Sequence, residues 1–300
     1  MVIDIHAHPT CFEAIFRAEE SVRWNLEMGL LITKEAPMEL LFAQMDHAGV
    51  DRLCLMPLDL TTERGIRIVE NEDIAELVRR WPERFIGFAG VDPWREDAVE
   101  TLEHAFRDLG LRGLKLHPSR QKFYPSDERL EPLYEICLRY DRPIMFHAGT
   151  SWEPDTPAEY SMPLCFEKLA IRHPELRFCL AHFGWPWVRE TAMLLMKYPN
   201  VYADTSLCYC DRPADFLRQT FTVDLSKLWM ENGYADKVMF ATNLPRFGMK
   251  DMAEGIRSLG LRNKTEKKIF AGNALTFLGL TEEELKGLDP ERKDPEGQVR

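Results

Sequence analysis

The chain has 300 residues, 45% of them hydrophobic, and a formal net charge of −11 at pH 7. A core of that size fits one domain, and α/β barrels commonly use about 250 residues as a single domain. The negative charge argues against nucleic acid and anionic membranes as partners, because both would be repelled by the average field, but it excludes little else.

The N-terminus reads MVIDIHAH, without the basic and apolar regions of a secretion signal, and no run of about 18 apolar residues occurs. We therefore expect a soluble, cytoplasmic protein. The seven cysteines form an odd number, and several lie in apolar runs, which is typical of reduced core thiols. Cys208 and Cys210 lack the two-residue spacer and the second pair of a zinc knuckle, so no structural metal site is expected there.

Eight short apolar runs recur along the chain, at residues 2–6, 51–57, 84–91, 112–118, 142–148, 176–182, 200–206 and 237–243. In the stretches between them, such as 37–50, 71–85, 96–110 and 129–141, apolar residues recur at helical spacing. Alternating strands and helices imply parallel strands joined by right-handed crossovers, and eight such units close a barrel. An open doubly wound sheet is the alternative, but the G-x-G-x-x-G turn of a dinucleotide site is missing. The sequence therefore favours an α/β fold, a single (β/α)8 TIM barrel over residues 1–280.

Two segments fall outside the eight units. Residues 10–35 are long for a βα loop and carry several aromatic side chains, so they are expected either to cap the barrel mouth as a helical lid or only to pack on its surface. Residues 265–280 have a helical pattern. The charged tail over 281–300 ends in DPERKDPEGQVR, which predicts a frayed end.

Reactive side chains fall at the ends of the predicted strands, where TIM barrels place their active sites. These strand-end residues are His6, His8, Lys115, His117, His147, His182, Asp204 and Asn243. His6 and His8 are two residues apart on one strand and therefore face the same way. Two imidazoles there, with a third from across the barrel, can bind one cation in the open geometry of catalytic zinc. One such histidine alone would indicate a hydrogen-bonded barrel residue, whereas the whole set favours metal binding or catalysis.

The ordered strand-end motifs resemble the amidohydrolase superfamily, and specifically its amidohydrolase-2 (amidohydrolase-related) branch. The motifs are IDIHAH, GLKLHP, MFHAGT, LAHFGWP, YADTS and FATNLP with a late GNALTFLGL, and they span residues 2 to 280. The resemblance implies a distorted barrel in which His6, His8 and His147 hold a divalent metal. Zinc is the expected metal, because imidazole ligands suit it, and manganese is the alternative. The resemblance also implies that His182 acts on the substrate or polarises the metal-bound water, or binds a second metal in binuclear relatives.

One departure from the family pattern concerns Asn243, because the family usually has an aspartate there that binds metal and moves the proton of the attacking water. An amide oxygen can coordinate a metal, but it cannot take a proton at neutral pH. Asn243 therefore indicates either an impaired enzyme or one in which another group is the base. We regard Asn243 and His182 as candidate catalytic residues, with His182 as the first candidate for the base.

Lys115 has two interpretations. Superfamily members with two metals carry a carboxylated lysine on strand four as a bridging ligand, and Lys115 shares a face with His117. In the other interpretation Lys115 forms a salt bridge within the barrel and His117 contacts substrate. We favour this second interpretation, and therefore a site with one metal.

Candidate substrate-binding residues near the rim are His117, Arg120, Trp152, Trp185 and Arg246. Aromatic walls suit a flat ligand and arginine forks suit a carboxylate, so a small aromatic or unsaturated carboxylic acid fits both. Taken singly, each tryptophan could equally pack a loop, and each arginine could equally be solvated.

The sequence thus predicts a metal-dependent hydrolase that acts on an amide, ester or lactone bond of a small, carboxylate-bearing substrate. The first alternative is a metal-dependent decarboxylase, a lyase acting on an aromatic or unsaturated carboxylic acid. The others are a metal-free lactonase and a catalytically impaired barrel that binds a ligand, which Asn243 favours. The oligomeric state is left open, although a homodimer is common among soluble enzymes.

Overall fold

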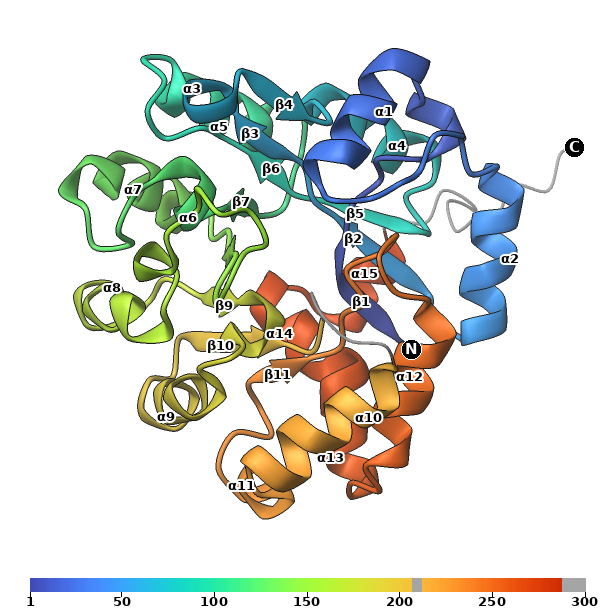
Figure 1. The fold of residues 1–300 in the computed structure, drawn as a ribbon, viewed down its shortest axis with the longest axis vertical. Coiled ribbons are helices and arrows are strands. Elements are labelled where there is room, and N and C mark those ends of the chain that lie inside the picture. Colours follow the sequence, from blue (N-terminus) through green and yellow to red (C-terminus); the bar gives the residue numbers. More distant parts are fainter. Residues whose placement is uncertain (207–211, 288–300) are drawn as a thin grey trace, which may run out of the picture.

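Each of the eight apolar runs forms a parallel strand of one barrel (Figure 1). The computed structural model describes residues 1–206 and 212–287. The barrel strands are β1 (Ile3–Ala7), β2 (Arg52–Leu55), β5 (Phe85–Gly87) with its continuation β6 (Ala89–Gly90), β7 (Leu114–Leu116), β8 (Ile144–Phe146), β9 (Phe178–Leu180), β10 (Val201–Asp204) and β11 (Val238–Met239). All of their residues are buried, as expected for strands covered on both faces.

The ring of strands closes between its last and first members. Hydrogen bonds connect β1–β2–β5 and β6 through β11 in sequence order, and the third strand is interrupted only between β5 and β6. Ala7 forms a bridge to Leu244, and the N–H of Ile5 donates to the carbonyl of Phe240 at 3.0 Å. The predicted barrel is confirmed, and the doubly wound sheet is excluded.

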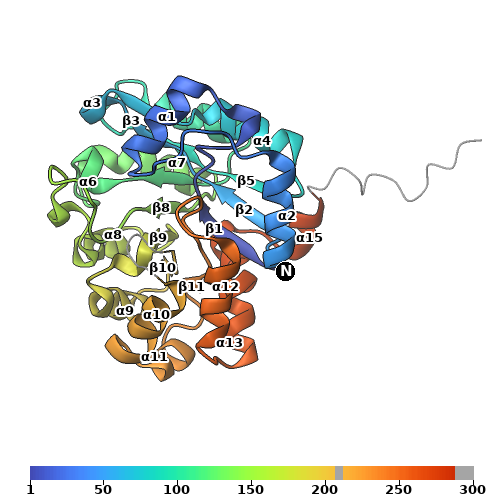
Figure 2. The same ribbon diagram turned by 45° about the vertical axis from the view of Figure 1, so that its right-hand side comes forward.

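The amphipathic stretches form helices that surround the barrel (Figure 2). They are α2 (Met38–Ala48), α4 (Asn71–Arg80), α5 (Ala98–Arg107), α7 (Glu131–Arg139), α8 (Glu167–Arg172), α9 (Val188–Lys197), α10 (Pro213–Arg218), α11 (Lys227–Asn232), α12 (Met249–Ser258), α13 (Asn263–Lys267) and α14 (Asn273–Leu278). The sequence determines where α2 begins and ends: the helix follows Pro37 and stops at Gly49, whose φ of 70° is left-handed. No helix among the described residues is long and apolar enough to cross a bilayer.

Three further segments of the chain add elements to the eight units. An antiparallel hairpin of β3 (Leu58–Leu60) and β4 (Ile66–Ile68) follows β2 and encloses the short helix α3 (Thr61–Arg64). The 10–35 insertion contains α1 (Ala18–Glu27). In the expected tail, Glu282–Gly287 forms α15, where Leu285 is fully buried and its carbonyl accepts a hydrogen bond from Arg52 at 3.3 Å. Part of the charged tail therefore packs on the barrel, while residues 288–300 lie outside the described residues.

The cysteines that the structure describes are free thiols. Cys11, Cys54, Cys137 and Cys179 are buried and Cys165 is half-buried. The C-Y-C pair, Cys208 and Cys210, lies outside the described residues.

Candidate active site

The strand-end residues other than Asp204 converge on one pocket at the carboxyl ends of the barrel strands, with an empty volume of about 420 Å³. The predicted residues that line it are His6, His8, Lys115, His117, Arg120, His147, Trp152, His182, Asn243 and Arg246. The pocket thus brings together residues from most of the barrel strands and from the loops that follow them.

Trp185 does not line this pocket. It lines a separate, mostly apolar pocket that His182 also borders, and its ring centroid lies 6.0 Å from that of Phe216. Three consecutive left-handed residues, His182 to Gly184, with φ of 59°, 48° and 62°, redirect the chain before Trp185. The structure therefore separates Trp185 from the other candidate substrate-binding residues.

The Nε2 atoms of His6 and His8, which we call the nitrogen pair, lie 3.1 Å apart. The other nitrogen of each ring is held by an acceptor. The Nδ1 of His6 lies 2.9 Å from Oδ2 of Asp204, and the Nδ1 of His8 lies 2.8 Å from the carbonyl of Met56. Because these partners accept, each Nδ1 carries the hydrogen, and a neutral ring keeps a lone pair on Nε2.

Burial keeps both rings neutral. Desolvation, with the nearby charge of Lys115, lowers the pKa of His6 well below its usual value and the pKa of His8 to about 3. At pH 7 the nitrogen pair therefore presents two lone pairs to the same small volume.

The nitrogen pair fits one divalent cation. Two nitrogens at about 2.0–2.1 Å from a tetrahedral zinc ion lie roughly 3.4 Å apart, close to the observed separation. Metal-binding histidines usually donate their other N–H to a carboxylate or a backbone carbonyl, and Asp204 and Met56 occupy those positions here. The donor set is therefore suited to a metal.

His147, the expected third ligand, stacks on His117 with ring centroids 3.8 Å apart and ring planes 9° apart. Its Nε2 lies 3.1 Å from the carbonyl of Thr150 and 3.0 Å from Oγ of Ser151. A carbonyl can only accept, so Nε2 carries the hydrogen and Nδ1 keeps the lone pair. Burial lowers the pKa of His147 well below its usual value, which keeps the ring neutral. In this arrangement His147 would bind a metal through Nδ1.

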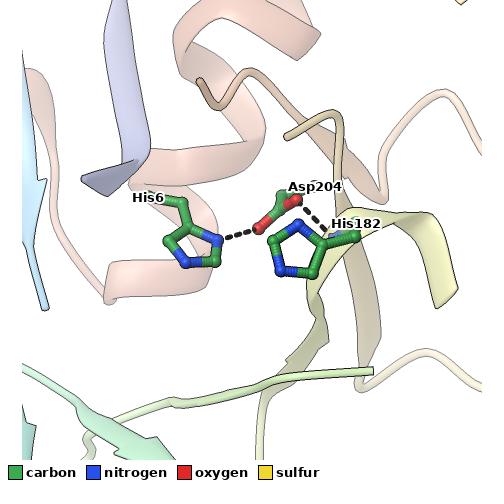
Figure 3. Close-up of side chains that lie close together, drawn as sticks. All are labelled: His6, His182 and Asp204. Carbon is green, nitrogen blue, oxygen red and sulfur yellow. Dashed lines mark hydrogen bonds and ion pairs between the residues drawn. The ribbon is translucent and has the colours of Figure 1, made fainter. Parts of the chain in front are cut away.

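A second candidate metal cluster consists of His6, His182 and Asp204 (Figure 3), whose ligand-type atoms lie within 4.8 Å of one another. Both oxygens of Asp204 already accept hydrogen bonds. Oδ2 accepts from His6, and Oδ1 accepts the backbone N–H groups of His182 at 2.8 Å and Ser206 at 3.0 Å. We therefore interpret Asp204 as the residue that orients His6 and the turn after β9, rather than as a ligand.

His182 lines the pocket, and one of its ring nitrogens contacts Ser206. Its Nδ1 lies 2.8 Å from Oγ of Ser206, and in Figure 3 its Nε2 points away from Asp204. Burial and the neighbouring His147 lower its pKa well below the usual value, so the ring is neutral.

Lys115 and Asn243 flank His6. The Nζ of Lys115 lies 3.4 Å from Nε2 of His6, and the lysine is 2% exposed. Asn243 follows β11 with a left-handed φ of 59°, and its N–H donates to the carbonyl of His6 at 2.9 Å. Asparagine tolerates this conformation better than most residues, and the bend places its side chain at the pocket.

The 10–35 insertion contributes to the wall of the pocket. Met28 lines the pocket, Arg120 donates to the carbonyl of Glu27 at 3.1 Å, and Arg246 donates to the carbonyl of Met28. Arg120 also pairs with the carboxylate of Glu153. Among the described residues, nothing accepts a hydrogen bond from its buried Nε and Nη1. Nη1 faces the carboxylate of Glu27 at 3.9 Å, whereas the Nε–H donor is suited to a ligand carboxylate.

Three contributors were not assigned a role from the sequence. Asp204 was identified only as a strand-end residue, and Ser206 and Glu153 were not identified. Asp204 and Ser206 are two residues apart and share a face, which is a signal that the YADTS motif carries. Glu153 lies in the loop after β8, where no periodic pattern indicates direction.

The chain resembles known proteins in sequence and in fold. A family model described as amidohydrolase matches residues 3–280. One curated relative, protein fluG of Emericella nidulans, is 29% identical over 100 residues, or 31% of this chain. The matched part is 11% of fluG, so the activity of that whole protein is not transferred.

Three solved structures show the same fold. An uncharacterised TIM-barrel protein from Bordetella bronchiseptica has a TM-score of 0.71 at 21% identity, covering 93% of this chain and 99% of that one. The 4-oxalomesaconate hydratase of Rhodopseudomonas palustris has a TM-score of 0.65 at 23% identity, covering 96% and 98%. A dihydroxybenzoic acid decarboxylase from a Polaromonas species, with bound manganese and the inhibitor 2-nitroresorcinol, has a TM-score of 0.62 at 19% identity, covering 93% and 96%.

Proposed function

Because the chain belongs to the amidohydrolase family, we propose that it is a divalent-metal-dependent hydrolase. Its substrate is a small molecule with a carboxylate and with an amide, ester or lactone bond as the target. The nitrogen pair carries this proposal, because two buried lone pairs 3.1 Å apart form a favourable site only when a cation lies between them. His6 and His8 would hold the metal, with His147 as the third ligand.

Zinc is the metal that we propose, and manganese, which is bound in the Polaromonas decarboxylase, is the alternative. Such an ion, when bound, polarises a substrate carbonyl and activates water for attack.

The other pocket residues position the substrate. Arg120 offers its buried Nε–H donor to the substrate carboxylate, and Arg246 adds a second guanidinium to the pocket. The stacked rings of His117 and His147 form a flat wall against which a planar ligand can lie. His182, neutral and with Nε2 directed away from Asp204, accepts the proton of the attacking water.

A second candidate is a metal-dependent decarboxylase, which the amide of Asn243 favours. Loss of carbon dioxide consumes no water, so decarboxylation does not need a carboxylate on strand eight to take the proton of an attacking water, whereas hydrolysis does. The reaction still needs a proton carrier, and His182 is again the candidate. The likeness to decarboxylase structures supports this alternative at the level of the fold.

The test is a turnover screen of the zinc- and manganese-loaded protein on lactones, esters, amides and aromatic carboxylic acids, with carbon dioxide measured separately. Hydrolysis without carbon dioxide would support the first proposal, and carbon dioxide release would support the second. His182→Gln should abolish either activity, whereas the exposed His104→Gln should leave it unchanged. If neither the protein nor Asn243→Asp turns over any substrate while metal and carboxylates bind, the chain is a ligand-binding barrel.

A further inference from the structure

Ser206 lies where His6, His182 and Asp204 meet. Its Oγ lies 2.5 Å from Oδ1 of Asp204, 2.8 Å from Nδ1 of His182 and 3.3 Å from Nδ1 of His6. The residue is 1% exposed, so these neighbours rather than solvent determine where its single hydrogen points.

The direction of each hydrogen bond follows from counting donors. Oδ1 of Asp204 accepts two backbone N–H groups, which can only donate, so this oxygen acts as an acceptor. The Ser206 hydroxyl must then donate its hydrogen to Oδ1. Only the lone pairs of Oγ remain for His182, so the Nδ1 of His182 is the donor and carries the ring hydrogen.

We propose that Ser206 is a positioning residue that holds the hydrogen of His182 on Nδ1 and leaves the lone pair of Nε2 facing the pocket. The role of His182 as proton acceptor rests on the proposed hydrolase function. The tautomer itself is a property of the folded chain and can be measured without turnover.

This arrangement supplies a base where Asn243 cannot. As water attacks, its oxygen bonds to the carbonyl carbon and one of its protons moves to Nε2 of His182. The resulting imidazolium still donates from Nδ1 to Ser206, and Ser206 donates to Asp204, so the carboxylate stabilises the new charge. The bond between the carbonyl carbon and the departing oxygen or nitrogen then breaks, and the same proton moves from Nε2 to that departing atom. Ser206 and Asp204 keep their own protonation states throughout.

The first test is NMR of the metal-free protein labelled with 15N in its histidines, at pH 7.5. Long-range correlations distinguish a ring protonated at Nδ1 from one protonated at Nε2, and His182→Gln identifies the signals of His182. We expect the Nδ1–H form in the unmodified chain and in Ser206→Thr, and loss of that preference in Ser206→Ala. A ring protonated at Nε2 in the unmodified chain would overturn the proposal without any variant.

The second test is kinetic. Ser206→Ala should lower kcat about 10- to 100-fold, which is typical for the loss of a residue that orients an active-site side chain through a hydrogen bond. KM and metal content should be unchanged, and Ser206→Thr should restore the rate. Unchanged kcat in Ser206→Ala would contradict the proposal. If the unmodified protein turned over no substrate, the proposed function would fail, while the NMR result would still decide the tautomer.

Discussion

The nitrogen pair places Nε2 of His6 only 3.1 Å from Nε2 of His8, although each ring already donates its one hydrogen elsewhere. Two lone pairs repel at this distance. The ammonium of Lys115, 3.4 Å from Nε2 of His6, offsets part of that repulsion. A divalent cation between the two nitrogens would replace the repulsion with two coordinate bonds. The carbonyl of Met56 and the carboxylate of Asp204 therefore fix the two rings in an arrangement suited to a cation before any ion binds.

Carboxylate binding should depend on Arg120 and be opposed by Glu153, whose carboxylate already occupies one end of the guanidinium. Arg120→Lys keeps the charge but loses the planar fork, and the loss of charge-assisted hydrogen bonds of about 1.5–3 kcal/mol corresponds to roughly 10- to 100-fold weaker binding. Glu153→Gln should strengthen binding, because the competing charge is removed. Calorimetric titration with benzoate measures both.

The exposed Arg129, which pairs with Asp127 away from the pocket, provides the control, and Arg129→Lys should leave the Kd for benzoate unchanged. Equal affinities for the unmodified protein and Arg120→Lys would show that the carboxylate binds elsewhere.

Substitutions at Asn243 should change the free energy of unfolding according to how well the new residue tolerates the left-handed backbone conformation. Asn243→Ala adds a strain of about 1–2 kcal/mol at φ 59°, whereas Asn243→Gly removes the same side chain without strain. The glycine variant should therefore be the more stable of the two in urea unfolding. At Ala241, outside the left-handed region, Ala→Gly should instead destabilise. If the glycine variant at position 243 were less stable than the alanine variant, the claim that alanine is strained there would be contradicted.

The stability of the metal-free protein should fall as the pH falls from 7.5 to 5.5. The five pocket histidines, His6, His8, His117, His147 and His182, have pKa values lowered by burial. Below about pH 6.5 the unfolded chain binds protons that the folded chain does not, so each histidine costs up to about 1.4 kcal/mol per pH unit. Burial raises the pKa of Asp4 to about 7, so Asp4 titrates in the opposite sense and offsets about one histidine.

Urea denaturation at both pH values measures this effect. His182→Gln should show a weaker pH dependence than the unmodified chain. An unfolding free energy that does not change between pH 7.5 and 5.5 would contradict neutral burial of these rings.

The strands and the rim could be predicted because both follow from simple periodicities. Barrel strands are buried on both faces and therefore appear as short apolar runs, and parallel topology brings all their carboxyl ends to one rim. That is why His6, His147 and His182, far apart in sequence, were expected together and lie in one pocket.

Features set by local backbone geometry could not be predicted. The left-handed turn at His182 redirects Trp185 to a different pocket, and no residue pattern indicates that turn. The choice between Nδ1 and Nε2 in His147 depends on the carbonyl of Thr150, which only coordinates can place. The helix α15 could not be predicted to pack on the barrel, because its one buried side chain, Leu285, lies among charged residues and forms no amphipathic pattern.

The most direct test of the metal site is the metal content of the protein purified from medium containing zinc and manganese. The comparison needs the His6→Ala, His8→Ala double variant and, as the control, His104→Ala on the exposed face of α5. We predict about one equivalent of metal in the unmodified protein and in the control, and none in the folded double variant. A folded, unmodified protein without metal, or a double variant that retains it, would contradict the assignment of the nitrogen pair.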